Sequence, residues 1–131
     1  MLNIPTELQY LLADETKAFA FIATTMPDGS PQVTPVWFNT EGESILVNTV
    51  QGRTKYRNLK ADPRVALAIP DPQDPYRYIQ LRGRVVEFAT EGGMEHIQHL
   101  AMIYTGKPWD FPADQVRVIC KISIEAVDAH V

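Results

Sequence analysis

Hydrophobic and polar residues alternate along much of the chain, in runs of the length that single β-strands need. The clearest run covers residues 76–88, where Ile79, Leu81, Gly83 and Val85 share one face and polar side chains occupy the other. A period of two is typical of a strand with one buried face. Similar runs predict further strands at residues 18–25, 32–38, 44–50, 65–69 and 116–124.

Two short turns separate the first three predicted strands. Their sequences are Pro27-Asp28-Gly29-Ser30 and Thr40-Glu41-Gly42-Glu43. Strand runs joined by a tight glycine-containing turn are typical of a β-hairpin. We therefore predict a three-stranded meander over residues 18–50, and a loop at residues 71–75, which contain two prolines.

Helical spacing is confined to three short segments. Residues 5–13 carry leucines at 8, 11 and 12, residues 52–61 form a short basic segment that Asp62-Pro63 ends, and a third stripe runs from Met94 to Tyr104. Six strands with about three helices predict a mainly β fold. We expect a closed, six-stranded antiparallel barrel with peripheral helices, as a single domain spanning residues 1–131.

Composition narrows the range of partners. Of the 131 residues 45% are hydrophobic and 21% charged, and the net charge is −4. This acidic balance argues against nucleic acid and anionic membranes as partners. The single Cys120 leaves no internal disulfide, and no run is long or apolar enough to span a bilayer. We expect a soluble, cytoplasmic protein.

The segment from Asn48 to Asn58 is the most informative for chemistry. A strand leads through Gly52 into a short helix that begins with Arg53, Thr54 and Lys55. Free N–H groups and the helix dipole favour an anion at such a start, and the two cations would add charge-assisted bonds to phosphate oxygens. The alternative is a solvated amphipathic helix with no ligand. The spacing does not match a Walker loop.

Aromatic residues next to strand breaks give a second set of candidates. Pro35, inside a strand and close to Trp37, predicts either an edge strand or an open backbone that contacts a planar heterocycle. Trp109 and Phe111, in the late loop, are candidates for a dimer contact or for closing over a ligand.

Three further residues are interpreted structurally. His96 and His99 lack the additional ligands that a zinc site needs, so we expect exposed helix residues and no metal. Cys120 falls among the apolar positions of a strand, so we expect a core residue and no nucleophile. No residue is assigned a catalytic role.

Three motifs, in order along the chain, resemble those of the pyridoxamine 5′-phosphate oxidase-like split barrels. They are Thr25 to Pro31 followed by Pro35-Val36-Trp37-Phe38, Gly52 to Leu59 followed by Asp62-Pro63-Arg64-Val65, and Tyr78-Ile79-Gln80-Leu81-Arg82-Gly83. The resemblance covers about residues 5–127. It implies an FMN-binding type of split β-barrel, and a homodimer with two cofactor sites at the interface.

The resemblance also implies roles for individual residues. Lys55 would meet the cofactor phosphate, with Arg53, Thr54 and Asn58 in support. Asn48 and Thr49 would line the ribityl chain. The backbone at Thr34, Pro35 and Val36 would flank the isoalloxazine-type ring, and Gln32 and Tyr78 would approach it from the side.

Within this superfamily, Gly-Arg-x-Lys-x-Arg-Asn-Leu is most similar to the branch that uses the deazaflavin coenzyme F-420. The cofactor implied is FMN or this deazaflavin. The chain lacks the arginine-rich C-terminal segment of true pyridoxamine phosphate oxidases, so vitamin B6 oxidation is not expected. The function implied is that of an oxidoreductase transferring hydride to a small conjugated substrate; the alternative is a non-catalytic flavin carrier or sensor.

Overall fold

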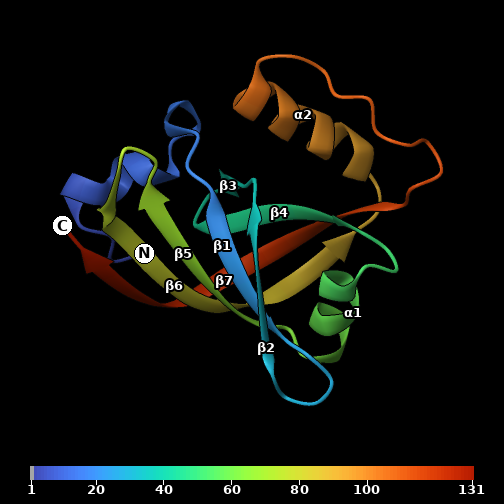
Figure 1. Ribbon diagram of the computed structural model, residues 1–131, viewed down its shortest axis with the longest axis horizontal. Helices are drawn as coiled ribbons and strands as arrows, with labels where there is room; N and C mark the ends of the chain where they lie inside the picture. Colours follow the sequence, from blue (N-terminus) through green and yellow to red (C-terminus); the bar gives the residue numbers. More distant parts are fainter. Residues whose placement is uncertain (1) are drawn as a thin grey trace.

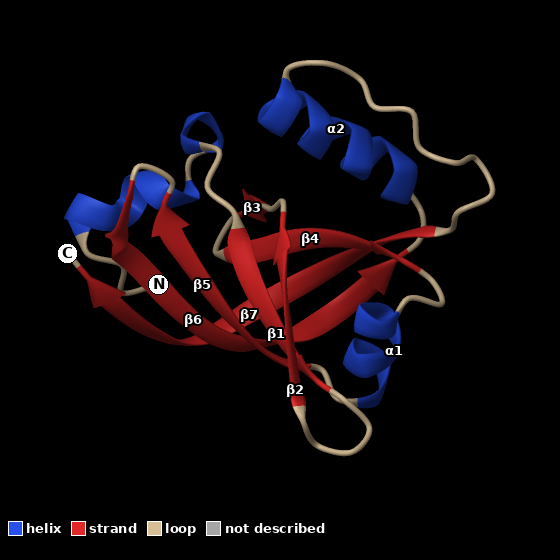
Figure 2. Ribbon diagram, viewed as in Figure 1, coloured by secondary structure: helices blue, strands red, loops and turns tan. Residues whose placement is uncertain are grey.

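The computed structural model describes residues 2–131 as one curled antiparallel sheet with peripheral helices (Figure 1, Figure 2). The sheet is seven-stranded, in the order β2-β1-β5-β6-β7-β4-β3. The predicted mainly β, antiparallel split barrel is confirmed, except that the strand count is seven and not six. No helix of residues 2–131 is long and apolar enough to cross a membrane.

The strands have the following bounds: β1 Ala20–Thr25, β2 Pro31–Val36, β3 Asn39–Glu41, β4 Ser44–Val50, β5 Arg64–Asp71, β6 Asp74–Ala89 and β7 Arg117–His130. The helices are the 3₁₀ segments η1 Thr6–Leu12 and η2 Asp14–Thr16 and the α-helices α1 Thr54–Ala61 and α2 Gly93–Thr105.

The extra strand is β3, which lies where a turn was predicted. Asn39 pairs with Leu46, and Glu41 with Ser44, so the turn itself shrinks to Gly42 and Glu43. Likewise β5 and β6 continue almost to their shared turn, and only residues 72–73 remain of the predicted loop. In both places tertiary pairing extends the ladder into residues that have weak strand propensity.

The predicted meander is wrong. Although β2 pairs with β1 as expected, β4 pairs with β7 and β3, and not with β2. Only Trp37 and Phe38 lie between β2 and β3, the two edges of the sheet, so the sheet must curl to bring its edges together. Within residues 2–131 no ladder joins these edges, and the barrel is therefore split between β2 and the Val47–Val50 part of β4.

Strand alternation fills the interior of the barrel. Ile79, Leu81, Gly83 and Val85 of β6 are buried, as their spacing predicted. The first helix is a 3₁₀ helix, in which residues three apart share one face, and it buries its leucines at 8 and 11 completely. It covers one end of the barrel, on the side away from α1 (Figure 1).

The two α-helices take different positions. Helix α2 covers the outer face of β4 and β7. Leu46 and Val50 on that face, and Ile97 and Leu100 of α2, are buried. Helix α1 follows β4 and packs against β1, at the end of the split opposite the Trp37-Phe38 junction (Figure 1). The split is thus bounded by chain at one end and by α1 at the other.

Candidate functional site

The start of α1 has the free donors that an anion site requires. Gly52 takes the left-handed conformation with φ of 92°, which lets the chain turn sharply from β4 into the helix. Arg53, at the N-cap, has extended backbone and makes no side-chain capping bond. The first N–H groups of the helix therefore have no capping side chain, and the Arg53 side chain beside them is exposed to solvent.

Lys55 is the central cation of this site. Its side chain is half-buried beside the Cys120 thiol of β7, with the guanidinium of Arg53 nearby. Burial lowers the pKa of Lys55, and the charge of Arg53 lowers it further. Across residues 2–131 no carboxylate pairs with Lys55. A half-buried ammonium group with no counter-ion is suited to bind an anion.

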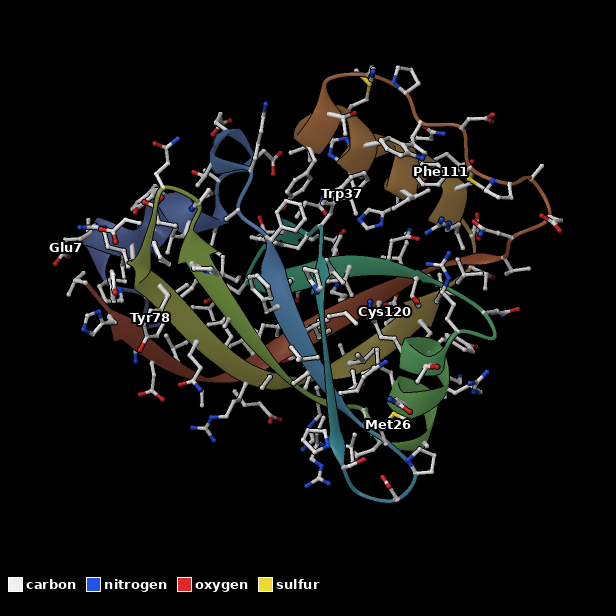
Figure 3. The ribbon with its side chains drawn as sticks, in the orientation of Figure 1. Glu7, Met26, Trp37, Tyr78, Phe111 and Cys120 are labelled. Atoms are coloured by element: carbon white, nitrogen blue, oxygen red, sulfur yellow. The ribbon has the colours of Figure 1, made fainter. Side chains whose placement is uncertain are left out.

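Thr54 and Asn58 lie on a different face of α1, four residues apart. They line a hollow of about 560 Å³ between the helix and the β1–β2 turn. Asn58 is buried and donates to Thr24 Oγ1 at 3.0 Å and to Met26 Sδ at 3.3 Å. Its amide thus joins α1 to the β1–β2 hairpin, while Lys55 points elsewhere. Figure 3 shows Met26 beside α1.

Strand β2 places the predicted ring-contacting residues on the free edge of the sheet. Gln32, Thr34 and Val36 face inward, because they pair with the buried Thr24, Ile22 and Ala20 of β1. The hydroxyl of Thr34 is buried and has no hydrogen-bond partner. An orphaned hydroxyl and unpaired backbone groups therefore line the split.

The structure separates Asn48 from Thr49. Thr49 is buried and shares the inner face of β4 with Val47 and Ile45. Asn48 points to the outer face, under α2, where its amide donates to the Gly93 carbonyl at 2.9 Å. The two side chains therefore do not line one channel.

His96 differs from its prediction, since it is 9% exposed. Its ring contacts Asn48 Nδ2 at 3.0 Å and Asn39 Oδ1 at 2.8 Å. Burial, with a smaller contribution from His99, lowers the pKa of His96 to about 4. Within residues 2–131 no group of His, Cys, Asp and Glu side chains is arranged to hold a metal ion.

Tyr78 lies far from the other predicted site residues of the same chain. It is on the outer face of β6, 37% exposed, with its ring stacked at 5.5 Å on His130. Figure 3 shows it at the opposite end of the barrel from Met26 and Cys120. Within one chain, Tyr78 therefore does not approach the start of α1.

Sequence reasoning missed Arg117, whose side chain is 8% exposed at the start of β7. Its position opposite Val50 on the outer face follows from the alternation with Val118, but its burial depends on α2 and on the loop before β7. Its charge lies near Arg53. Cations from the β4–α1 loop, α1 and β7 are therefore grouped at one corner of the barrel.

The family model for pyridoxamine 5′-phosphate oxidase matches residues 4–130. The chain belongs to this family. An F420 reductase structure is 36% identical, with a TM-score of 0.85, covering 95% of this chain and 98% of the other. Together these matches place the chain among the flavin- and deazaflavin-related oxidoreductases.

More distant members of the split-barrel fold also superpose. A conserved hypothetical protein of Mycobacterium tuberculosis is 22% identical with a TM-score of 0.75, over 97% of this chain and 85% of its own. General Stress Protein 26 of Bacillus anthracis is 16% identical with a TM-score of 0.68, over 95% of both chains. These likenesses show the fold alone. A comparison with curated protein sequences gave no match.

Proposed function

We propose that the chain binds FMN or the deazaflavin coenzyme F-420 and catalyses hydride transfer to a small conjugated acceptor. Family membership and the 36% identity to an F420 reductase support this class of chemistry. The observation that carries the proposal is Lys55, a half-buried cation without a counter-ion at the start of α1.

The residues fit the phosphate end of such a cofactor. Lys55 and Arg53 would bond the phosphate oxygens, and the first N–H groups of α1 would add their donors. Thr54 lies on the face of the helix toward the β1–β2 turn and would support the phosphate from that side. Asn58 acts indirectly, because its buried amide fixes α1 against β1.

The free edge of β2 fits the ring. Its unpaired backbone groups and the orphaned hydroxyl of Thr34 offer donors and acceptors to the polar edge of a flavin-type ring. A reduced ring of this class supplies the hydride, and the protein supplies binding, orientation and exclusion of water. Gln32 and Val36, on the same inner face, would contact the ring beside Thr34.

Cofactor titration tests this assignment. Purified protein is titrated with FMN and with the deazaflavin coenzyme, and ring fluorescence reports the dissociation constant. We expect Lys55→Met to raise that constant by about 10- to 100-fold, which corresponds to loss of a charge-assisted hydrogen bond. The matched control is Lys60→Met, on the same helix, where the ammonium is exposed and lies over the Phe88 ring.

Equal affinities of the Lys55→Met and Lys60→Met proteins would exclude the phosphate assignment, and so would the absence of binding to the unaltered chain. The enzymatic part has its own readout, the rate at which the bound, reduced cofactor is reoxidised. Conjugated acceptors should raise this rate in proportion to their concentration. A rate that no acceptor changes would favour the carrier or sensor function.

We also propose a homodimer formed through the outer face of β1, β2 and β5. Apolar residues share this face by register, since Phe21 lies opposite Pro35 and Ala68, and Val33 opposite Ala23. Phe21 is 41% and Val33 62% exposed. A hollow of about 450 Å³ that Arg64 and Arg82 help to line lies next to them. Tyr78 is on the same outer face, so a dimer would place it at the interface.

Sedimentation velocity tests the dimer. We expect Val33→Glu to shift the chain toward monomer, because a carboxylate would be buried within the apolar contact. Val116→Glu is the control, since Val116 is also exposed but precedes β7 on the side of α2. A monomeric unaltered protein, or equal mass distributions for both variants, would contradict the proposed interface.

A further inference from the structure

Arg117 has no anionic partner, although its side chain is buried. Its Nη2 donates to the amide oxygen of Gln115 at 2.9 Å, and its Nη1 is 3.4 Å from that of Asn48. Its Nε is buried without a partner. No carboxylate within residues 2–131 forms an ion pair with it. Burying an uncompensated cation costs free energy, so a counter-ion from outside the chain would be stabilised here.

The Nε and Nη2 edge of the guanidinium, on which only Nη2 has a partner, has the geometry of a bidentate anion site. The Nε–H and one Nη–H of arginine point in parallel and match the two oxygens of a carboxylate or phosphate. In Arg117, Nη2 of this edge donates a hydrogen bond to the neutral Gln115 amide, and Nε has no hydrogen-bond partner. An anion that replaced the Gln115 oxygen would satisfy both donors.

The surroundings add positive charge. Burial lowers the pKa of Arg117, and the neighbouring Arg53 lowers it further. Helix α2 begins against the same residue, since a Cβ placed on Gly93 would lie 2.1 Å from the Arg117 carbonyl oxygen. The N-terminal end of a helix carries partial positive charge. Helix α2 therefore begins beside the Arg117 backbone, and Arg53 adds positive charge to the site from the side of α1.

An aromatic row continues from this arginine. The ring of Phe111 lies 4.7 Å from the Arg117 guanidinium, Trp109 is 6.4 Å from Phe111, and Trp37 is 6.2 Å from Trp109. Trp109 is 49% exposed. In Figure 3, Trp37 lies between the barrel and α2, and Phe111 lies on the loop beyond α2. The rings are not coplanar, since Trp37 meets Trp109 at 77° and Trp109 is inclined to Phe111 by 32°. The row offers an apolar aromatic surface that ends in a cation.

We propose that Arg117 and the aromatic row Phe111, Trp109 and Trp37 form a binding site for a flat conjugated ligand that carries a carboxylate or phosphate group. The anionic group takes the Nε and Nη2 edge of Arg117, and the apolar body lies on the exposed side of Trp109. This inference rests on the proposed function in one respect: we take this ligand class to be the hydride acceptor of the proposed reaction. It names a second site that adjoins that of Lys55, since both cations lie near Arg53.

Nuclear magnetic resonance provides a local readout, because Trp37 and Trp109 are the only tryptophans and their indole N–H signals report the row directly. The probes are cinnamate, its neutral amide and phenyl phosphate, each titrated at constant ionic strength. We expect cinnamate or phenyl phosphate to shift an indole signal saturably. The neutral amide should bind at least about tenfold more weakly than cinnamate, because it lacks the charge-assisted bonds.

Two substitutions test the role of the arginine. Arg117→Gln should weaken binding of the anionic probe by about tenfold or more, while Lys60→Gln, at an exposed position of α1, leaves it unchanged. Gln115→Glu keeps the shape of the side chain and places a carboxylate on the Arg117 edge from within the chain. It should raise the melting temperature and abolish probe binding, and it stays informative if Arg117→Gln does not fold.

Cofactor titration separates this proposal from the preceding one. Lys55→Met should weaken cofactor binding and leave the affinity for the probe unchanged. Arg117→Gln should weaken probe binding and leave the affinity for the cofactor unchanged. If Arg117→Gln weakens FMN or F-420 as much as Lys55→Met does, the arginine belongs to the cofactor site and the proposal is overturned. Equal affinities for cinnamate and its amide overturn the proposal as well. So does the absence of binding of any probe at 20 mM, a concentration that corresponds to a binding free energy of only about −2 kcal/mol.

Discussion

Asn48 donates a hydrogen bond of 3.0 Å to Nδ1 of His96. The orientation of the amide is fixed, because the same nitrogen donates to the Gly93 carbonyl and its oxygen faces Arg117. Nδ1 therefore accepts, and the imidazole proton lies on Nε2, which donates to Asn39 Oδ1 at 2.8 Å. These contacts fix the neutral tautomer of His96 on the buried face of α2.

The neutral state of His96 predicts a dependence of stability on pH. Its pKa falls from 6.5 to about 4 in the folded protein. Between these values the unfolded chain binds more protons than the folded one. The contribution of the neutral His96 to the free energy of unfolding is therefore fully present above about pH 6.5 and is lost as the pH falls toward 4. We expect His96→Gln to flatten this dependence, as measured by urea unfolding at pH 7.5 and at pH 5.

The matched control is His99→Gln, three residues along the same helix but exposed. Its unfolding free energy should keep the pH dependence of the unaltered protein. The same slope in the His96→Gln and unaltered proteins would show that His96 does not carry this effect.

We expect the Asn58 amide to stabilise the packing of α1 against the β1–β2 hairpin. Asn58→Ala removes the donor to Thr24 and Met26, and should lower the free energy of unfolding by about 1–3 kcal/mol. Lys60→Ala, on the exposed side of the same helix, should cost less than about 1 kcal/mol. Urea unfolding at neutral pH measures both, and equal losses would contradict the assigned role.

Two glycines predict different costs for different reasons. A Cβ at Gly83 would lie 2.0 Å from the Ser123 carbonyl oxygen of β7, so Gly83→Ala should cost about 3 kcal/mol through displaced strands. Gly29 has open space around it but a φ of 88°, and Gly29→Ala should cost only about 1 kcal/mol of backbone strain. Thermal unfolding of the two variants should rank them in this order, and the reverse order would refute the close strand approach.

The single cysteine predicts protection from thiol reagents. Cys120 is fully buried, and burial raises its pKa to about 12, with the nearby charge of Lys55 opposing the shift. The native protein should therefore react with a disulfide reagent only at the rate at which it opens, and fully in urea. Ala113→Cys, in the exposed loop, provides the fast-reacting control. A fast reaction of Cys120 in the native protein would contradict its burial.

Strand positions could be predicted from the sequence because alternation acts locally. The inner face of β6 is an example, since Ile79 to Val85 alternate as the structure has them. The order in which the strands pair could not be predicted in this way, because β4 pairs with β7, which is distant in the sequence, and not with β2. Strand β3 was missed because its ladder to β4 is only three residues long and adjoins a glycine turn.

For the site, the glycine and cations at the start of α1 were visible in the sequence. The facing of the side chains was not: Asn58 turns inward to Thr24, and Asn48 turns outward to α2. The burial of His96 depends on amides from β3 and β4, which no pattern within α2 reveals. Arg117 has no local signal of its own beyond the strand alternation.

The junction of Trp37 and Phe38 has a consequence for motion. Both edges of the sheet are covalently tied there, and the hydroxyl of Tyr104 bridges the Phe38 amide and the Ala18 carbonyl. At the other end of the split only noncovalent contacts close the barrel, with the Asn58 amide as one of them. Any widening of the split is therefore a rotation hinged at Trp37 and Phe38. Its amplitude is greatest beside Lys55, so we expect a cofactor to enter and leave at the α1 end.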